Sequence, residues 1–244
     1  MPLGSTFRLG GQTSFAVPDL APDAPFWAIG DVHGQYDLLA PLLDRVMREG
    51  EPVVLLGDYI NKGPDSAAVL RLVRQATATG QITALRGNHE QLLLQYLARP
   101  RVLTDSFFGL GGLATLHSFG IACTEPVLDL KQMSRLRNAL RAGLGELEDW
   151  IGTLPYFVRS GNVVALHAGA DPRSPIESQH PASFCWGHPR FATEERSDGD
   201  WIIHGHQPVV AVSMRQRRIA INTVDGKSGQ LSAVRIASGG ISTL

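Results

Sequence analysis

The chain has 244 residues, of which 43% are hydrophobic and 18% charged, and its 22 basic and 23 acidic side chains leave a net charge of -1. This composition excludes a mainly disordered chain, and the lack of an apolar run of about 18 residues excludes a membrane-spanning helix. The balanced charge gives no reason to expect binding to nucleic acid or to a membrane, and we expect a cytoplasmic protein without a signal peptide.

Residues 1–24 are rich in Gly, Pro, Ser and Thr and have no helical periodicity, so they predict an irregular lead-in to a single domain at 25–240. Within that domain, apolar strands end at glycines and lead into segments with helical spacing. The strands are expected at 26–29, 53–56 and 82–85, and the helices at 35–49, 64–78 and 89–98. Three successive strand–loop–helix units predict a parallel sheet covered by helices.

The second half predicts a helical insertion at 104–152, followed by a region rich in strands. A hairpin turn is expected at 160–162, between strands at 156–159 and 163–166. Further strands are expected at 201–203, 209–213, 219–222 and 231–236. We therefore predict an α/β fold, called α+β by some schemes, in which two mixed β-sheets pack together and are flanked by helices. The strands of the second half are expected to form the second sheet.

Polar side chains follow the predicted strands directly, next to glycines. These clusters contain Asp31 and His33, then Asp58, then Asn88, His89 and Glu90, then His167, and finally His204 and His206. Each cluster alone is more typical of an ordinary turn, but their recurrence at the carboxyl ends of strands predicts a shared site. Carboxylate and imidazole ligands suit Mn, Fe or Zn, and a carboxylate can bridge two ions. The sequence thus predicts a dinuclear metal site at the strand ends.

These motifs resemble the calcineurin-like metallophosphoesterases, in particular the branch that holds the PPP-type serine/threonine protein phosphatases and the diadenosine tetraphosphatases. The family signature GDxHG, GDxxxxG, GNHE, HAG and GH matches residues 30–34, 57–63, 87–90, 167–169 and 205–206, in that order. The resemblance spans about residues 26–236. It implies hydrolysis of phosphate esters by a hydroxide that bridges two metal ions, without a phosphoenzyme.

The resemblance also implies a role for each matching residue. Asp31 and His33 would hold the first metal, Asp58 would bridge, and Asn88, His167 and His206 would hold the second. His89 would protonate the leaving oxygen. The expected cofactors are two divalent metal ions, with Mn favoured and Fe or Zn compatible. His204 lies inside a predicted strand and is expected either to support the ligands without binding metal or merely to pack, and Glu90 is expected to orient its loop.

The second motif departs from the protein phosphatases, which usually carry Asp and Arg at the positions of Asn61 and Lys62. Asn61 can orient His89 by a hydrogen bond but offers no negative charge to its protonated form, so we expect a lowered pKa for His89 and a weaker general acid. Lys62 would bind phosphate as a point charge, without the two-pronged geometry of Arg. A weak acid handicaps alkyl phosphates more than phosphoanhydrides, because a phosphate leaving group has a pKa of about 6.

A second phosphate-binding residue is expected in the segment 184–191, which resembles a Trp-x-Arg stretch of bacterial relatives. His188 occupies the position of the Arg, and Arg190 is our candidate for its role. The alternative is that Trp186 and Phe191 simply pack a loop. Cys123 and Cys185 are far apart in sequence and predict two inert thiols.

Three functions follow from these patterns. The first is a PPP-type serine/threonine protein phosphatase-like phosphoesterase, which Gly57-Asp58-Tyr59 and Gly87–Glu90 favour. The alternative is a hydrolase of dinucleoside polyphosphates, which Asn61-Lys62-Gly63-Pro64 favours. A non-catalytic scaffold is disfavoured because every ligand position is filled. The expected partners are therefore a phosphorylated protein or a small phosphate or nucleotide.

Overall fold

The computed structural model describes the chain apart from residues 1–5, 10–11, 18, 124–128 and 226–228. In the first sheet the strand order is β1-β2-β12-β11-β3-β4-β5, and in the second it is β6-β7-β8-β10-β9. The strands are β1 (Thr6–Leu9), β2 (Gln12–Ala16), β3 (Phe26–Ile29), β4 (Val53–Leu55), β5 (Ile82–Ala84), β6 (Phe157–Ser160), β7 (Val163–Leu166), β8 (Trp201–His204), β9 (Ser213–Arg215), β10 (Arg218–Ala220), β11 (Ala233–Ala237) and β12 (Gly240–Thr243).

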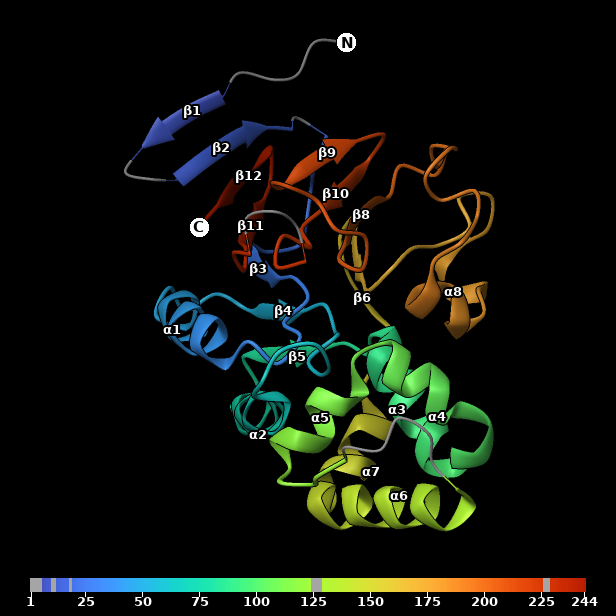
Figure 1. Cartoon of the computed structure of the whole chain (residues 1–244). Helices are drawn as coiled ribbons and strands as arrows, with labels where there is room; N and C mark the ends of the chain where they lie inside the picture. Colours follow the sequence, from blue (N-terminus) through green and yellow to red (C-terminus); the bar gives the residue numbers. More distant parts are fainter. Residues whose placement is uncertain (1–5, 10–11, 18, 124–128, 226–228) are drawn as a thin grey trace.

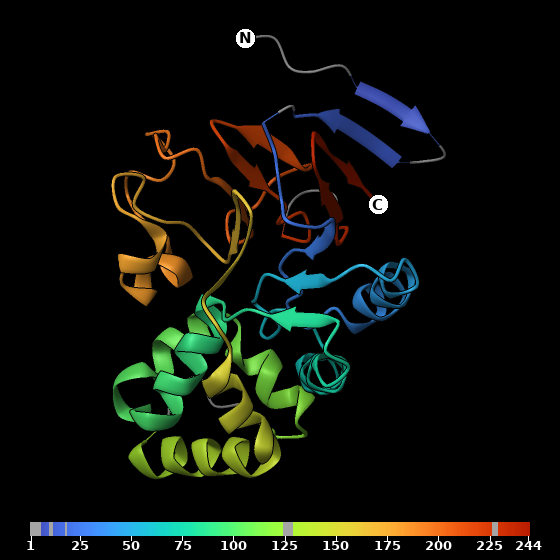
Figure 2. The ribbon, with the colours of Figure 1, turned by 180° about the vertical axis from the view of Figure 1, so that it is seen from behind.

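The longer helices pack against the first sheet, with the first of them beside β4 in Figure 1 and the others below the strands. They are α1 (Tyr36–Met47), α2 (Ser66–Thr77), α3 (Asn88–Ala98), α4 (Pro100–Gly109), α5 (Gly112–Ser118), α6 (Leu130–Leu144) and α7 (Glu146–Thr153), while α8 (Pro181–Trp186) lies beside the second sheet. The view from behind in Figure 2 shows α3 to α7 as one group. None of the described helices is long and apolar enough to cross a bilayer.

Alternate residues of the central strands enter different cores, because side chains on a strand point to opposite faces. On β3, Trp27 and Ile29 pack into the core between the first sheet and the helices, whereas Phe26 and Ala28 pack into the core between the two sheets. The inter-sheet core is completed from the second sheet, for example by Ala165 of β7. The chain therefore folds as two facing mixed sheets with flanking helices, as predicted.

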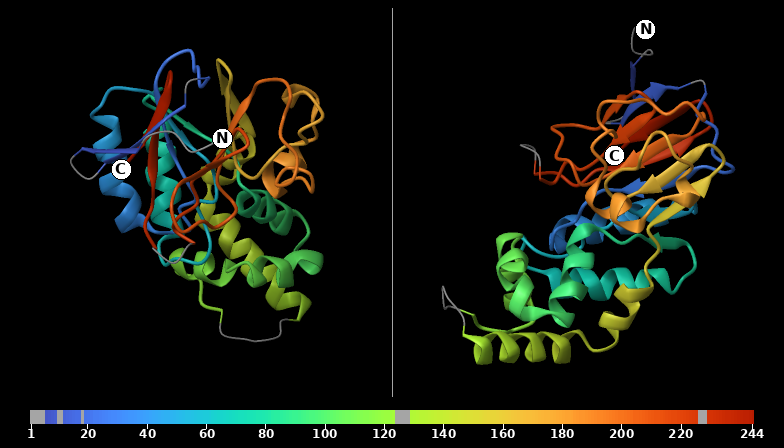
Figure 3. Two further views of the ribbon diagram at one scale, coloured as in Figure 1. Left: turned by 90° about the horizontal axis from the view of Figure 1, so that it is seen from above. Right: turned by 90° about the vertical axis from the view of Figure 1, so that its right-hand side faces the viewer.

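The strands β3, β4 and β5 pair in parallel, as the three strand–loop–helix units predict. The second sheet is also parallel at its centre, where β8 lies between β7 and β10. Their carboxyl ends therefore meet at one edge of the molecule, which Figure 3 shows from two further sides. This edge carries all the polar clusters found in the sequence.

Two expectations about the strands are wrong. The strands of the second half do not all join the second sheet, because β11 pairs antiparallel with β3 and β12 pairs with β2 in the first sheet. The strand expected at 209–213 is displaced to β9, Ser213–Arg215, where it pairs with β10. Alternation of apolar residues reveals a strand but not its partner, which explains the first difference.

The lead-in at 1–24 is not wholly irregular, because β1 and β2 form a hairpin and β2 pairs with β12. These strands are held by main-chain hydrogen bonds to the edge of the sheet. Such pairing requires little apolar periodicity in the sequence. Parts of two expected regions lie outside the described residues. They are residues 1–5, 10–11 and 18 of the lead-in, and residues 124–128 of the insertion expected at 104–152. The insertion is helical where it is described, from α4 to α7, and the domain boundaries stay a prediction.

Candidate metal centre

The loops that follow five parallel strands bring the predicted side chains together. Asp31 and His33 follow β3, Asp58 follows β4, Asn88 follows β5, His167 follows β7 and His206 follows β8. Candidate ligand atoms within 4.8 Å of one another occur in three groups, namely His33 with Asp58 and His89, Asp58 with His167 and His206, and Asp31 with His33 and Asp225. The cluster thus joins loops from both sheets at the edge where their parallel strands end.

Tight backbone turns aim these side chains inward. His33, Asp58 and His206 have φ angles of 46°, 54° and 59°, a left-handed conformation that non-glycine residues rarely adopt and that concentrates at functional sites. Neighbouring glycines permit the close approach of the loops. A Cβ on Gly205 would lie 2.0 Å from Asp31 Oδ1, and one on Gly87 would lie 2.1 Å from Asp58 Oδ1.

Main-chain carbonyls hold two of the histidine rings in place. His33 Nδ1 lies 3.0 Å from the Ile60 carbonyl oxygen, and His167 Nδ1 lies 2.9 Å from that of Leu56. Donation from Nδ1 to a carbonyl leaves Nε2 of each ring facing the cluster. Metal-binding histidines are usually oriented by such a contact.

The Asn88 side chain faces the two histidines of the second sheet. Its Oδ1 lies 2.9 Å from His167 Nε2 and 2.9 Å from His206 Nδ1. Asp58 is close to the same group, because its Oδ1 lies 3.3 Å from His167 Nε2. These four side chains are the set expected to hold the second metal.

Burial of two carboxylates without a fixed cation gives the cluster its electrostatic character. Asp31 and Asp58 are at most 2% exposed, and among the described residues only histidines lie within 4 Å of them as ion-pair partners. Burial raises the pKa of Asp31 to about 6. Burial also disfavours the charge of Asp58, but His167 and His89 outweigh it and hold its pKa well below the usual range.

The same carboxylate governs His167. Burial lowers the pKa of this ring, but attraction to Asp58 prevails and raises it to about 9. The buried carboxylates therefore give the pocket a negative charge that favours the binding of a cation. Asp31 and Asp58 have no Lys or Arg ion-pair partner among the described residues, and buried oxygen and nitrogen donors of this kind fit divalent transition-metal ions.

His89 has the partner that the sequence predicts. The Asn61 Nδ2 atom lies 2.7 Å from His89 Nδ1. The Thr115 hydroxyl donates to Asn61 Oδ1 at 2.7 Å, which assigns Nδ2 to the histidine side. Because Nδ2 can only donate, Nδ1 accepts and the ring proton lies on Nε2. Burial lowers the pKa of His89 to about 4, so the ring is neutral at pH 7.

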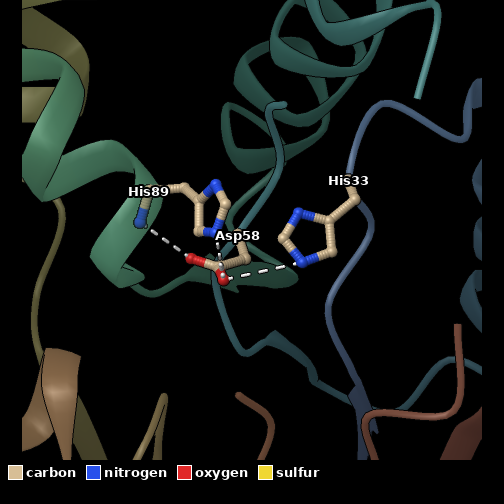
Figure 4. Close-up of side chains that lie close together, drawn as sticks. All are labelled: His33, Asp58 and His89. Atoms are coloured by element: carbon tan, nitrogen blue, oxygen red, sulfur yellow. Dashed lines mark hydrogen bonds and ion pairs between the residues drawn. The ribbon is translucent and has the colours of Figure 1, made fainter. Parts of the chain in front are cut away.

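Figure 4 shows the His33 and His89 rings on either side of Asp58. Each Nε2 lies 3.7 Å from Asp58 Oδ2, and the backbone N–H of His89 donates to Asp58 Oδ1 at 3.0 Å. The two ring centroids are 4.7 Å apart. His89 therefore lies against the carboxylate expected to bridge the metals.

Glu90 joins two of the loops. Its carboxylate accepts backbone N–H bonds from Asp58 and Tyr59 at 2.8 Å each and from Gly87 at 3.0 Å. Burial, followed by repulsion from Asp58, raises its pKa to about 7. Glu90 is fully buried and bonds the backbone of both loops, in agreement with its expected role in orienting the loop.

Lys62 reaches the cluster and meets a residue that sequence analysis did not find. Its Nζ lies 3.0 Å from His33 Nε2 and 2.6 Å from Asp225 Oδ2, and Asp225 Oδ2 lies 3.0 Å from His33 Nε2. Lys62 and His33 hold the pKa of Asp225 well below its usual range, although burial alone would raise it. Asp225 follows β10 and directly precedes Gly226, so the pattern of a polar residue beside a glycine after a strand could have found it.

Asn222 is a second residue that sequence analysis missed. Its Nδ2 donates to Asp31 Oδ2 at 2.8 Å and to the His206 carbonyl oxygen at 3.0 Å. It therefore links the loops after β3 and β8. Its position at a strand end was the only signal that could have suggested it.

The remaining predicted residues lie in different surroundings. Arg190 is 46% exposed and lies 3.8 Å from both Asp171 and Glu194, so no contact joins it to the ligand side chains among the described residues. Its role in phosphate binding stays a prediction, as do the individual ligand roles. His204 is buried in β8, with its ring 5.0 Å from that of Phe191, in agreement with a packing role.

The comparisons with known proteins agree on one family, but the similar proteins within it are named for different substrates. The family model of the calcineurin-like phosphoesterases matches residues 24–210. The chain is 27% identical over 232 residues to the asymmetrical bis(5'-nucleosyl)-tetraphosphatase of Bacillus velezensis, which covers 85% of this chain and 87% of that protein. It is 40% identical over 70 residues to serine/threonine-protein phosphatase 1 of Salmonella typhimurium, covering 28% of this chain.

Coverage differs among these relatives. The match spans only 31% of the Salmonella phosphatase, and 46% of a symmetrical bis(5'-nucleosyl)-tetraphosphatase from Nitrosospira multiformis. Among solved structures, a protein serine/threonine phosphatase from Saccharomyces cerevisiae superposes with a TM-score of 0.57 at 14% identity, over 93% of this chain and 84% of that one. At this identity the likeness is one of fold.

Proposed function

The chain belongs to the calcineurin-like phosphoesterases, and we propose that it hydrolyses phosphoanhydrides of the dinucleoside polyphosphate class. The observation that carries this choice is the contact between Asn61 and the neutral ring of His89. The tetraphosphatase match over most of the chain supports the same choice.

The proposed centre uses the side chains that converge at the strand ends. The first ion would be held by Asp31, His33 and Asp58, and the second by Asp58, Asn88, His167 and His206. Two divalent ions supply a hydroxide at neutral pH and neutralise the phosphoryl oxygens. Lys62 approaches the same side of the cluster as His33 and would bind a phosphate oxygen beyond it.

His89 limits the leaving groups that this centre can handle. With its proton on Nε2 and a pKa of about 4, the ring can donate a hydrogen bond to the leaving oxygen but rarely carries the extra proton of an acid near pH 7. A serine or threonine alkoxide needs a full proton transfer. A nucleotide phosphate leaves without one, since its pKa is about 6.

A phosphoprotein remains the second candidate substrate. The segment shared with the Salmonella serine/threonine phosphatase favours it, because that 70-residue match is 40% identical. A phosphoprotein needs a protonated His89 for its alkoxide leaving group, whereas a phosphoanhydride does not. A comparison of the two substrates therefore distinguishes the two functions.

The test compares kcat/KM for diadenosine tetraphosphate with that for a phosphothreonine peptide, with manganese and on one preparation. We expect strong preference for the dinucleotide, and loss of both activities in the Asp58→Asn variant. Preference for the peptide would reject the anhydride proposal in favour of the phosphoprotein. Full activity of Asp58→Asn would reject the proposed centre itself.

A further inference from the structure

A cavity of about 440 Å³ lies beside the histidines of the second sheet. Ala168 and Gln207 line it, and they directly follow His167 and His206 in the chain. Its volume falls in the range of small-molecule sites, about 300–1,000 Å³. The cavity is thus placed to hold the part of a substrate that extends beyond the reacting phosphate.

Trp186 provides one wall of this cavity and is exposed there. It ends α8 and is 44% exposed, although its neighbours Phe184 and Cys185 are buried. The Cys185 thiol donates to the Arg86 carbonyl at 3.6 Å, in the loop that leads to Asn88. The buried side of α8 therefore anchors the indole next to the metal loops, while its ring remains open to a ligand.

Two polar side chains complete the wall. The exposed Gln207 amide has no hydrogen-bond partner among the described residues, so both its donor and its acceptor are available. His188 lies 3.9 Å from Asp171, which restrains it at the cavity. A flat aromatic wall with a free amide suits a planar ring that carries donors and acceptors on its edge.

We infer that this cavity binds the nucleobase of the substrate, with Trp186 stacked on the ring and Gln207 at its edge. The inference rests on the proposed function and names the group that the site recognises. Stacking accepts any base, whereas a Gln amide can pair with adenine through two hydrogen bonds. A cavity of this volume has room for one planar ring system.

Inhibition by ADP tests the base contact without requiring a nucleotide substrate. ADP and pyrophosphate are compared as inhibitors of p-nitrophenyl phosphate hydrolysis in the wild type, Trp186→Ala and Trp186→Phe. We expect Trp186→Ala to weaken ADP about tenfold and to leave pyrophosphate unchanged. Trp186→Phe should retain most of the ADP affinity. Val210→Ala, at another exposed apolar residue, is the matched control and should change neither inhibitor.

Tryptophan fluorescence gives an independent readout. ADP should quench it in the wild type more than in Trp186→Phe, and pyrophosphate should leave it unchanged. Equal weakening of both inhibitors by Trp186→Ala would indicate a structural role and overturn the inference. An unchanged ADP affinity, or a raised KM for a phosphopeptide alone, would also overturn it.

The outcomes separate this inference from the proposed function. A selective loss of ADP binding combined with no hydrolysis of diadenosine tetraphosphate would keep the base site and reject the substrate. Hydrolysis of the dinucleotide together with an unchanged ADP affinity in Trp186→Ala would support the proposed substrate and reject the nucleobase site.

Discussion

The amide of Asn61 lies between the Thr115 hydroxyl and the His89 ring, with 2.7 Å to each partner. Thr115 belongs to α5, far along the chain from the loop that carries Asn61. This short chain of hydrogen bonds places the His89 proton on Nε2 and gives Nδ1 a neutral amide partner in place of a carboxylate. Under the proposed function, this side chain would set which leaving groups the centre can release.

Restoring a carboxylate should change that selection. In Asn61→Asp, attraction to the new charge should raise the pKa of His89 from about 4 towards neutrality. A raised pKa keeps the ring protonated to higher pH, so the variant should be more active on alkyl phosphates than the wild type. This gain should be lost as the pH rises above the new pKa of His89. The measurement is kcat/KM against pH for an alkyl phosphate and for diadenosine tetraphosphate.

The alkyl phosphate should gain about tenfold or more relative to the anhydride, on the scale of general acid catalysis. Asn61→Ala is the control, since it removes the orienting contact without adding charge. Equal effects of Asn61→Asp on both substrates would show that His89 protonation does not set the preference.

Cys185 should be chemically inert in the native protein. Burial raises the pKa of its thiol to about 12, so only about one molecule in ten thousand carries the thiolate at pH 8. We expect no labelling of Cys185 by iodoacetamide at pH 8 in a Cys123→Ser background, and full labelling after unfolding in guanidinium. Rapid labelling of the native protein would mean that α8 detaches from the loop before Asn88.

At the scale of elements, the turns after the strands position the donors. The loop after β8 passes so close to the loop after β3 that only glycine fits at residue 205. Helices contribute differently, because α3 begins at Asn88 and its first backbone N–H groups face the Asp58 carboxylate. The positive end of the helix thereby stabilises the charge of that carboxylate.

Gly205→Ala should disrupt the centre. Its Cβ would lie 2.0 Å from Asp31 Oδ1, so the carboxylate or the loop must move. We expect a 10- to 100-fold weaker metal affinity, comparable with the loss of an orienting contact, and a stability loss of about 1–3 kcal/mol. Metal titration and denaturant unfolding measure the two effects. Gly152→Ala, where a Cβ meets no atom within 4 Å, should leave metal affinity unchanged, and a similar loss there would contradict the argument.

For the whole molecule, the candidate centre connects the two sheets. Asp31, Asp58 and Asn88 come from loops of the first sheet, and His167 and His206 from loops of the second. Ions held between these loops would tie the sheets together at one edge. They would also relieve the repulsion between two buried carboxylates.

Metal removal should therefore lower the stability of the whole domain. At a metal concentration 100 times the Kd, binding adds about 2.7 kcal/mol, which raises the Tm of a chain this long by about 5–10 °C. Thermal unfolding with manganese and then with EDTA measures the difference. Asp58→Asn should show a much smaller shift, and a shift as large as that of the wild type would place the stabilising ion elsewhere.

The sequence alone determined the parallel strands β3, β4 and β5, the turns at their ends and the residue types that converge there. These features are local, since they depend on apolar periodicity and on glycines next to polar side chains. The contact between Asn61 and His89 was also predictable, because the two residues lie in the second and third motifs of the family signature. The ligand roles and the phosphate-binding role of Arg190 stay predictions.

Only the tertiary structure decided which distant residues meet. Thr115 reaches the site from a helix, and Asn222 and Asp225 reach it from the loop after β10. Their places in the sequence do not show which of the other loops they contact. The placement of β11 and β12 in the first sheet has the same origin. Motifs depend on neighbours along the chain and can be read from the sequence. Strand partners and long-range contacts depend on how whole elements pack, because backbone hydrogen bonds between strands form with many different sequences.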